Sequence, residues 1–225
     1  MQGVISLYRS SVGKKITMAL TGVPLYGFVI VHMIGNLKIY MGPDKYNHYA
    51  EFLRTFLSGV FGEGGFLWIA RLVLGTCVVL HIVAATQLTL TSWAARDVKY
   101  AKKEDLSFTY ASRTMRWGGV IIALFVAYHL LHFTTGNAHP AFDHENVYRN
   151  VVTGFGVWWV SLFYIAAMIP LGFHMYHGIW SMTQTLAIEN PRVLAWRRPA
   201  AAVLALVTVA GNVSIPIAVL SGLVR

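Results

Sequence analysis

The stretch FLWIARLVLGTCVVLHIVAATQLTLTSW at positions 66–93 decides the class of fold. It exceeds the roughly 20 mostly apolar residues that a helix needs to cross a bilayer. Four more stretches meet the same criterion, so we expect a single integral-membrane domain over residues 1–225. The expected spans are residues 16–40, 66–93, 117–135, 152–186 and 200–223.

The composition agrees with a membrane protein. The 225 residues are 56% hydrophobic and 12% charged, with a mean hydropathy of +0.56. Soluble domains carry about 25% charged residues. The composition therefore argues against a soluble enzyme, a nucleic-acid-binding domain and a disordered chain. The single cysteine, Cys77, excludes an intramolecular disulfide and any multi-cysteine metal or iron–sulfur site within this chain.

Basic residues predict the orientation of the spans. Lys and Arg gather on the cytoplasmic side of membrane proteins. Twelve of the 18 fall before the first span, between the second and third, or between the fourth and fifth. We therefore expect a multi-pass membrane protein with the N-terminus cytoplasmic and the C-terminus outside. The membrane is expected to be the cytoplasmic membrane of a prokaryote. The twelve are Arg9, Lys14, Lys15, Arg96, Lys99, Lys102, Lys103, Arg113, Arg116, Arg192, Arg197 and Arg198.

Histidines stand out inside the spans, which are almost free of Asp, Glu, Lys and Arg. Ionisable residues within a membrane are costly and usually functional. The first four spans each carry at least one histidine, and the fifth carries none. The six are His32, His81, His129, His132, His174 and His177.

Helix geometry sorts four of these histidines into two levels. With a rise of about 1.5 Å per residue and the alternating direction of the spans, His32 and His129 lie near the outer side. His81 and His174 lie nearer the inner side, about 13 Å away in depth if the spans are about 40 Å long. Two imidazoles at one depth on facing helices are what a bis-histidine haem requires. Zinc and copper would prefer three or four ligands at one level.

Other residues have weaker expected roles. Gly35 and Gly178 share a face with His32 and His174 and would let the backbone approach a flat porphyrin. His132 and His177 are expected to pack or to hydrogen-bond near the haems, although either could replace its neighbour as ligand. The loop histidines His48, His139 and His144 are expected to be solvated. The outer segment 41–65 is expected to form a short interfacial helix followed by a flexible turn.

Several motifs give the chain a family resemblance that runs nearly end to end. They are SVGKK at 11–15 with LTG at 20–22, HMIGN at 32–36, RWGG at 116–119, and HMYHGIWS at 174–181 with QTL at 184–186. On these motifs the chain resembles the five-helix, di-haem cytochrome b558 membrane subunit of succinate:quinone oxidoreductases and fumarate reductases. The resemblance implies an all-α bundle that encloses two b haems.

The resemblance also implies ligands and partners. The axial ligands would be His32 with His129 for the outer haem and His81 with His174 for the inner haem. The chain would be the quinone-reactive subunit of a respiratory enzyme, passing electrons between an iron–sulfur subunit and quinone. A cytoplasmic flavoprotein subunit would hold FAD and act on the dicarboxylate, and the iron–sulfur subunit would hold the clusters. The resemblance favours menaquinone and is compatible with a higher oligomer of the complex.

Quinone reduction needs a proton donor as well as electrons. Glu51 and Glu63 in the outer segment are candidates because acidic residues are scarce there; the alternative is ordinary interfacial charge. Lys14, Arg113 and Arg116 are candidates to pair with haem propionates or with the iron–sulfur subunit, unless they are only topology signals.

Three other functions compete with this one. The first is the di-haem cytochrome b of another respiratory enzyme, such as a hydrogenase or formate dehydrogenase, or a b561-type protein. The HMYHGIWS block on the fourth span argues against it. The second is a haem-free transporter, which would show acidic partners within the spans. The third is a structural anchor, which would lack ligands.

Overall fold

The computed structural model describes residues 8–95 and 110–225, with side chains in the second range described from Met115 onward. The described residues form helices and short connections, with no strand among them. Five helices are long and apolar enough to cross a membrane. The chain is therefore an all-α membrane protein. Four basic residues of the orientation argument lie outside the described residues: Arg96, Lys99, Lys102 and Lys103.

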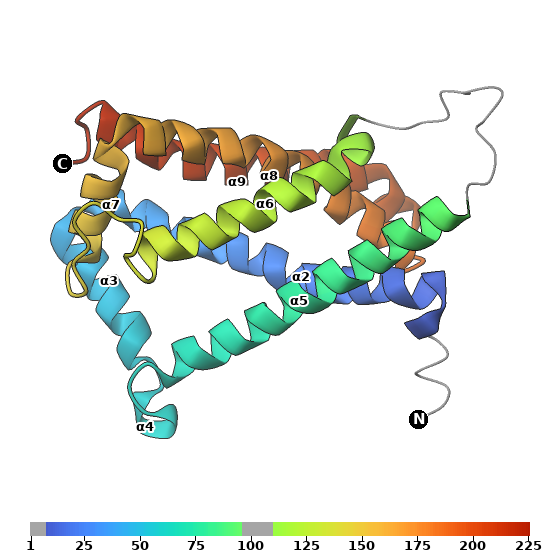
Figure 1. Cartoon of the computed structure of the whole chain (residues 1–225), viewed down its shortest axis with the longest axis horizontal. Helices are drawn as coiled ribbons and strands as arrows, with labels where there is room; N and C mark the ends of the chain where they lie inside the picture. Colours follow the sequence, from blue (N-terminus) through green and yellow to red (C-terminus); the bar gives the residue numbers. More distant parts are fainter. Residues whose placement is uncertain (1–7, 96–109) are drawn as a thin grey trace.

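The five long helices run between two ends of an elongated bundle, with the described chain starting at one end and finishing at the other (Figure 1). They are α2 (Ser11–Asn36), α5 (Gly65–Ala94), α6 (Tyr110–Phe133), α8 (Trp158–Thr185) and α9 (Pro191–Leu220). The 3-10 turn η1 (Leu37–Met41) extends α2. Three shorter helices, α3 (Pro43–Thr55), α4 (Ser58–Phe61) and α7 (Val147–Gly156), lie at the end that holds the C-terminus. We call it the outer end, after the sequence-based orientation.

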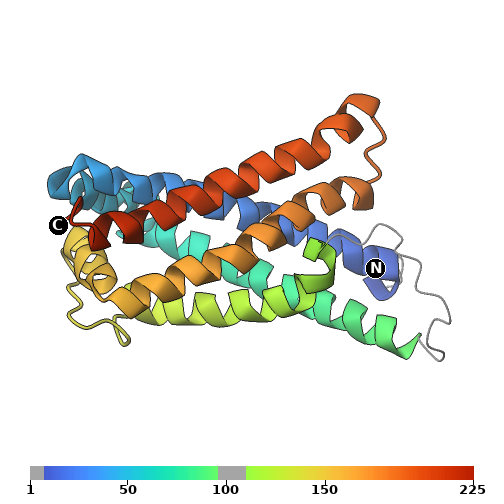
Figure 2. The ribbon, with the colours of Figure 1, turned by 90° about the horizontal axis from the view of Figure 1, so that it is seen from above.

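The packing order of the helices defines the middle of the bundle. Helix α2 packs along α5, and α8 packs between α6 and α9; Figure 2 shows α8 and α9 crossing α2. Two diagonal pairs, α2 with α6 and α5 with α8, are not among the closely packed pairs of the described chain. Contact between the two helices of each diagonal pair therefore depends on side chains that extend into the middle of the bundle.

The buried core lies at the outer end, where α3, α7, α8 and α9 meet. Tyr46, Phe155 and Tyr164 are its largest members. Elsewhere the helices keep apolar faces exposed: in α5 only Ala84 is buried, and Leu72 is 67% exposed. Apolar surface of this extent would be unfavourable in water, whereas hydrocarbon covers it at no cost.

Four span starts differ from the sequence-based expectation. Helix α2 begins at Ser11 rather than at residue 16, and α6 begins at Tyr110 rather than at residue 117. The fourth span was expected to begin at residue 152, but α7 ends at Gly156 and α8 begins at Trp158. Val157 between them is extended, and the Ser161 hydroxyl donates to the Phe155 carbonyl at 2.6 Å. Hydropathy does not detect this break because residues on both sides of it are apolar.

The fifth helix begins at Pro191 rather than at residue 200. The Asn190 side chain accepts a hydrogen bond from the Arg192 N–H at 2.9 Å, and Pro191 occupies the first helical position. Both features favour a helix start. The hydropathy criterion placed the start of this helix later because Arg192, Arg197 and Arg198 lower the mean hydropathy of its first part.

The outer segment after α2 holds one helix more than expected. Gly42 has a φ of 92°, a conformation that favours glycine, and Pro43 starts α3 directly after it. Beyond α3, the expected flexible turn contains α4, which is only one turn long.

Candidate haem and quinone sites

The structure brings the first-span and third-span histidines together across one diagonal of the bundle. The ring centres of His32 on α2 and His129 on α6 lie 5.8 Å apart, with the rings nearly perpendicular at 87°. His132, one turn further along α6, faces a different group of side chains. Of the two histidines of α6, His129 is therefore the one opposite His32.

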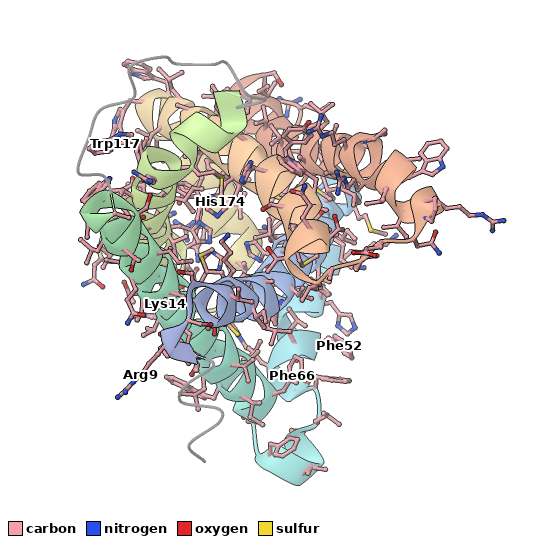
Figure 3. All side chains as sticks on the ribbon, turned by 90° about the vertical axis from the view of Figure 1, so that its right-hand side faces the viewer. Arg9, Lys14, Phe52, Phe66, Trp117 and His174 are labelled. Atoms are coloured by element: carbon pink, nitrogen blue, oxygen red, sulfur yellow. The ribbon has the colours of Figure 1, made fainter. Side chains whose placement is uncertain are left out.

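The other diagonal carries the second pair. The ring centres of His81 on α5 and His174 on α8 lie 6.1 Å apart at an angle of 56°. In the view along the bundle, His174 lies in the space that the helices enclose, whereas Arg9 and Trp117 lie at its edge (Figure 3). His177 turns to Trp180 instead, with ring centres 5.1 Å apart.

The spacing within each pair suits two ligands of one iron. Imidazole nitrogens bind metal ions at about 2 Å, so two rings on opposite sides of one ion have centres roughly 6 Å apart. The diagonal helices that carry the pairs are held apart, which leaves the middle of the bundle to side chains. Among the described residues, no group of three or more His, Cys, Asp or Glu side chains could hold a metal ion. The donor set therefore fits paired axial ligation better than a zinc or copper site.

The two rings of the inner pair differ in their hydrogen bonds. His81 Nδ1 lies 3.3 Å from the Thr21 hydroxyl. His174 Nδ1 is buried without a hydrogen-bond partner among the described residues. A buried polar atom without a partner is costly, so this pair is completed most simply by a bound group.

Two glycines that the sequence reasoning gave no role lie against these inner rings. A Cβ at Gly22 would be 3.6 Å from His81 Cε1, and one at Gly119 would be 4.0 Å from His174 Cε1. Gly22 belongs to the LTG motif, and Gly119 belongs to the RWGG motif. Spacing along one helix could not reveal their role because each glycine faces a histidine on another helix.

The outer pair is oriented by side chains from two further helices. The Tyr46 hydroxyl donates to Asn36 Oδ1 at 3.3 Å, and the Asn36 amide lies 3.1 Å from His32 Nε2. Burial, with a smaller contribution from Tyr49, raises the pKa of Tyr46 to about 12, so its hydroxyl remains protonated at neutral pH. For His32 to bind iron through Nε2, the Asn36 amide must turn away. On α6, His129 Nδ1 lies 3.4 Å from the Tyr164 hydroxyl.

The two glycines expected to lie beside a porphyrin, Gly35 and Gly178, have different surroundings. A Cβ at Gly35 would lie 2.7 Å from the Tyr49 hydroxyl oxygen, so Gly35 accommodates α3. The expectation for Gly35 was wrong because the sequence does not show that α3 folds back against α2. A Cβ at Gly178 would meet no atom within 4 Å.

One loop histidine is also placed differently from the expectation. His139 was expected to be solvated, but its ring stacks on the buried His132, with ring centres 5.0 Å apart. Its Nε2–H donates to the Asn150 carbonyl at 2.8 Å, and the Ala141 N–H donates to its Nδ1 at 3.0 Å. The His48 and Glu51 side chains, by contrast, are 84% and 71% exposed.

The two candidate acids line one cavity at the outer end. It measures about 530 Å³ and lies between α3 and the loops around it. Helix α3 connects this cavity to the outer pair, because it carries both Glu51 and Tyr46. The lining residues are Asp44, Asn47, His48, Glu51, Arg54, Thr55, Glu63 and Glu145.

The basic candidates lie at the opposite end of the bundle. Arg116 lies over the Trp93 ring, 5.6 Å from its centre, and Arg198 lies 5.0 Å from the centre of the Trp180 ring. Lys14 lies in the first turn of α2 at the same end (Figure 3). The side chain of Arg113 lies outside the described residues. No acidic partner within the described residues pairs with Lys14 or Arg116.

Comparison with protein families adds an independent finding to this geometry. Residues 107–213 match the family model of the succinate dehydrogenase/fumarate reductase transmembrane subunit. The match covers just under half of the chain and supports membership of this family. It includes His129 and His174, one member of each pair, but not His32 or His81. Comparisons with curated proteins and with solved structures found no match.

Proposed function

We propose that this chain is the di-haem cytochrome b membrane subunit of a succinate:quinone oxidoreductase. The observation that carries the proposal is the pair of histidine couples on the two diagonals, with ring centres 5.8 and 6.1 Å apart. The family match supports the enzyme class. It also favours this class over the hydrogenase and formate dehydrogenase type of di-haem cytochrome.

His32 and His129 would hold the outer haem, and His81 and His174 the inner haem. When bound, each haem would carry one electron at a time between the iron–sulfur subunit and quinone. The chain itself holds the imidazoles at two depths, excludes water from them and orients their second nitrogens. Thr21 would do so for His81, and Tyr164 for His129.

The basic end of the bundle is the proposed docking side for the iron–sulfur subunit, which in turn would bind the FAD-carrying flavoprotein. Arg116 and Arg198 at this end would attract acidic surface on such a partner. At the other end, Glu51 and Glu63 would supply protons to quinone at the cavity they share. The resemblance favours menaquinone as the substrate.

Co-purification tests the enzyme class. An affinity-tagged chain, extracted in mild detergent from the cells that produce it, should bring with it one flavoprotein with covalent FAD and one iron–sulfur protein. The isolated complex should reduce a quinone analogue with succinate as electron donor. Capture of a hydrogenase or formate dehydrogenase catalytic subunit in their place would contradict the proposal.

A further inference from the structure

The feature that carries a further inference is a hydroxyl shared by two histidines at the outer end. The Tyr164 hydroxyl lies 2.9 Å from His132 Nδ1 and 3.4 Å from His129 Nδ1. Tyr164 is 6% exposed and His132 is fully buried. These contacts are therefore made away from solvent, and water does not compete for them.

One proton on the hydroxyl sets the roles of both histidines. A tyrosine hydroxyl donates one hydrogen bond and can accept others. Donation to His132 Nδ1, the nearer of the two nitrogens, leaves the hydroxyl oxygen to accept from His129 Nδ1–H. His129 is then the Nδ1–H tautomer, with an unprotonated Nε2. An imidazole binds metal through an unprotonated nitrogen, and the hydrogen bond at its other nitrogen fixes which one that is.

His132 is held in place by packing on its other side. Its ring stacks on His139, and a Cβ at Gly154 would lie 2.9 Å from His132 Cε1 and 3.0 Å from Nε2. His132 Nε2 is buried without a hydrogen-bond partner in the described part of the chain. The ring therefore has little freedom to turn toward His32, and its Nδ1 remains aimed at Tyr164.

We propose that Tyr164 and His132 are positioning residues that hold His129 in the tautomer whose Nε2 can bind the outer haem. This inference rests on the proposed function. This inference gives His132, the second histidine of the HLLH segment, a role other than ligation. His132 accepts the hydrogen bond that the Tyr164 hydroxyl would otherwise donate to His129. Donation to His129 Nδ1 would favour the tautomer whose Nε2 is protonated and cannot bind iron.

The test compares Tyr164→Phe with Tyr128→Phe in the purified full chain. Tyr128 is a matched control because its ring stacks on His132 at 5.6 Å, while its buried hydroxyl has no partner among the described residues. Haem transfer to excess apomyoglobin should be about 10- to 100-fold faster for the outer haem of Tyr164→Phe, the usual range for a lost second-shell contact. Its midpoint potential should become more positive, because the ligand loses basicity. Tyr128→Phe should leave both values unchanged.

A second variant separates positioning from packing. In His132→Phe the Tyr164 hydroxyl is free to donate to His129, so the outer haem should be lost faster than from Tyr164→Phe. Adding Tyr164→Phe to that variant should slow the loss again. Equal behaviour of Tyr164→Phe and Tyr128→Phe in a chain with two haems would overturn the positioning role alone. A wild-type chain without haem would overturn the proposed function and this inference together.

Discussion

Replacing His174 with alanine is expected to remove the inner haem and leave the outer haem in place. Replacing His81 should remove the same haem, because the two rings face each other across one diagonal, with centres 6.1 Å apart. Each variant should fall from two haems per chain to one, and the same component of the reduced spectrum should disappear from both. The pyridine haemochrome assay and low-temperature spectra measure these changes.

His177 provides the matched control for this prediction. It lies one turn after His174 on α8 but turns toward Trp180. His177→Ala should therefore keep both haems. If His177→Ala loses the inner haem while His174→Ala retains it, the ligand on α8 has been assigned to the wrong histidine.

Replacing His32 or His129 with alanine is expected to remove the other haem. Their ring centres lie 5.8 Å apart on the second diagonal, and the pairing of α2 with α6 is independent of the pairing of α5 with α8. The double variant His32→Ala/His129→Ala should match either single variant, whereas His32→Ala/His174→Ala should lose both haems. The haem content of each variant, and the spectral component that each variant lacks, test this pairing.

The exposed His48 at the outer end serves as the control here, and His48→Ala should bind haem normally. The contradicting outcome is a different grouping of the variants. If His32→Ala and His81→Ala remove the same spectral component, the two histidines serve one iron and the pairing by depth is wrong. Monodisperse elution in detergent for every variant excludes misfolding as the cause.

Much of the fold could be predicted because hydropathy and helix rise are properties of single helices. The five spans follow from runs of apolar residues, and the structure confirms an all-α membrane protein with five helices of suitable length. The depths of His32, His81, His129 and His174 follow from their distance to the span ends. The structure places as neighbours the same two couples that this reasoning proposed.

Features that depend on contacts between helices could not be predicted in this way. Gly35 faces Tyr49 of α3, and His139 stacks on His132, because a segment distant in sequence folds back against a span. Tyr164 gave no sequence signal, since a tyrosine within an apolar span is ordinary. The break before Trp158 was missed because glycine and valine continue an apolar run as readily as they end a helix.

The central claim is that each of the two histidine pairs binds one haem. The haem content of the purified wild-type chain tests this claim most directly. The account predicts a reduced b-type spectrum and a pyridine haemochrome value of two haems per polypeptide. A chain that is helical and monodisperse in detergent, produced in haem-sufficient cells and nonetheless colourless, would contradict it.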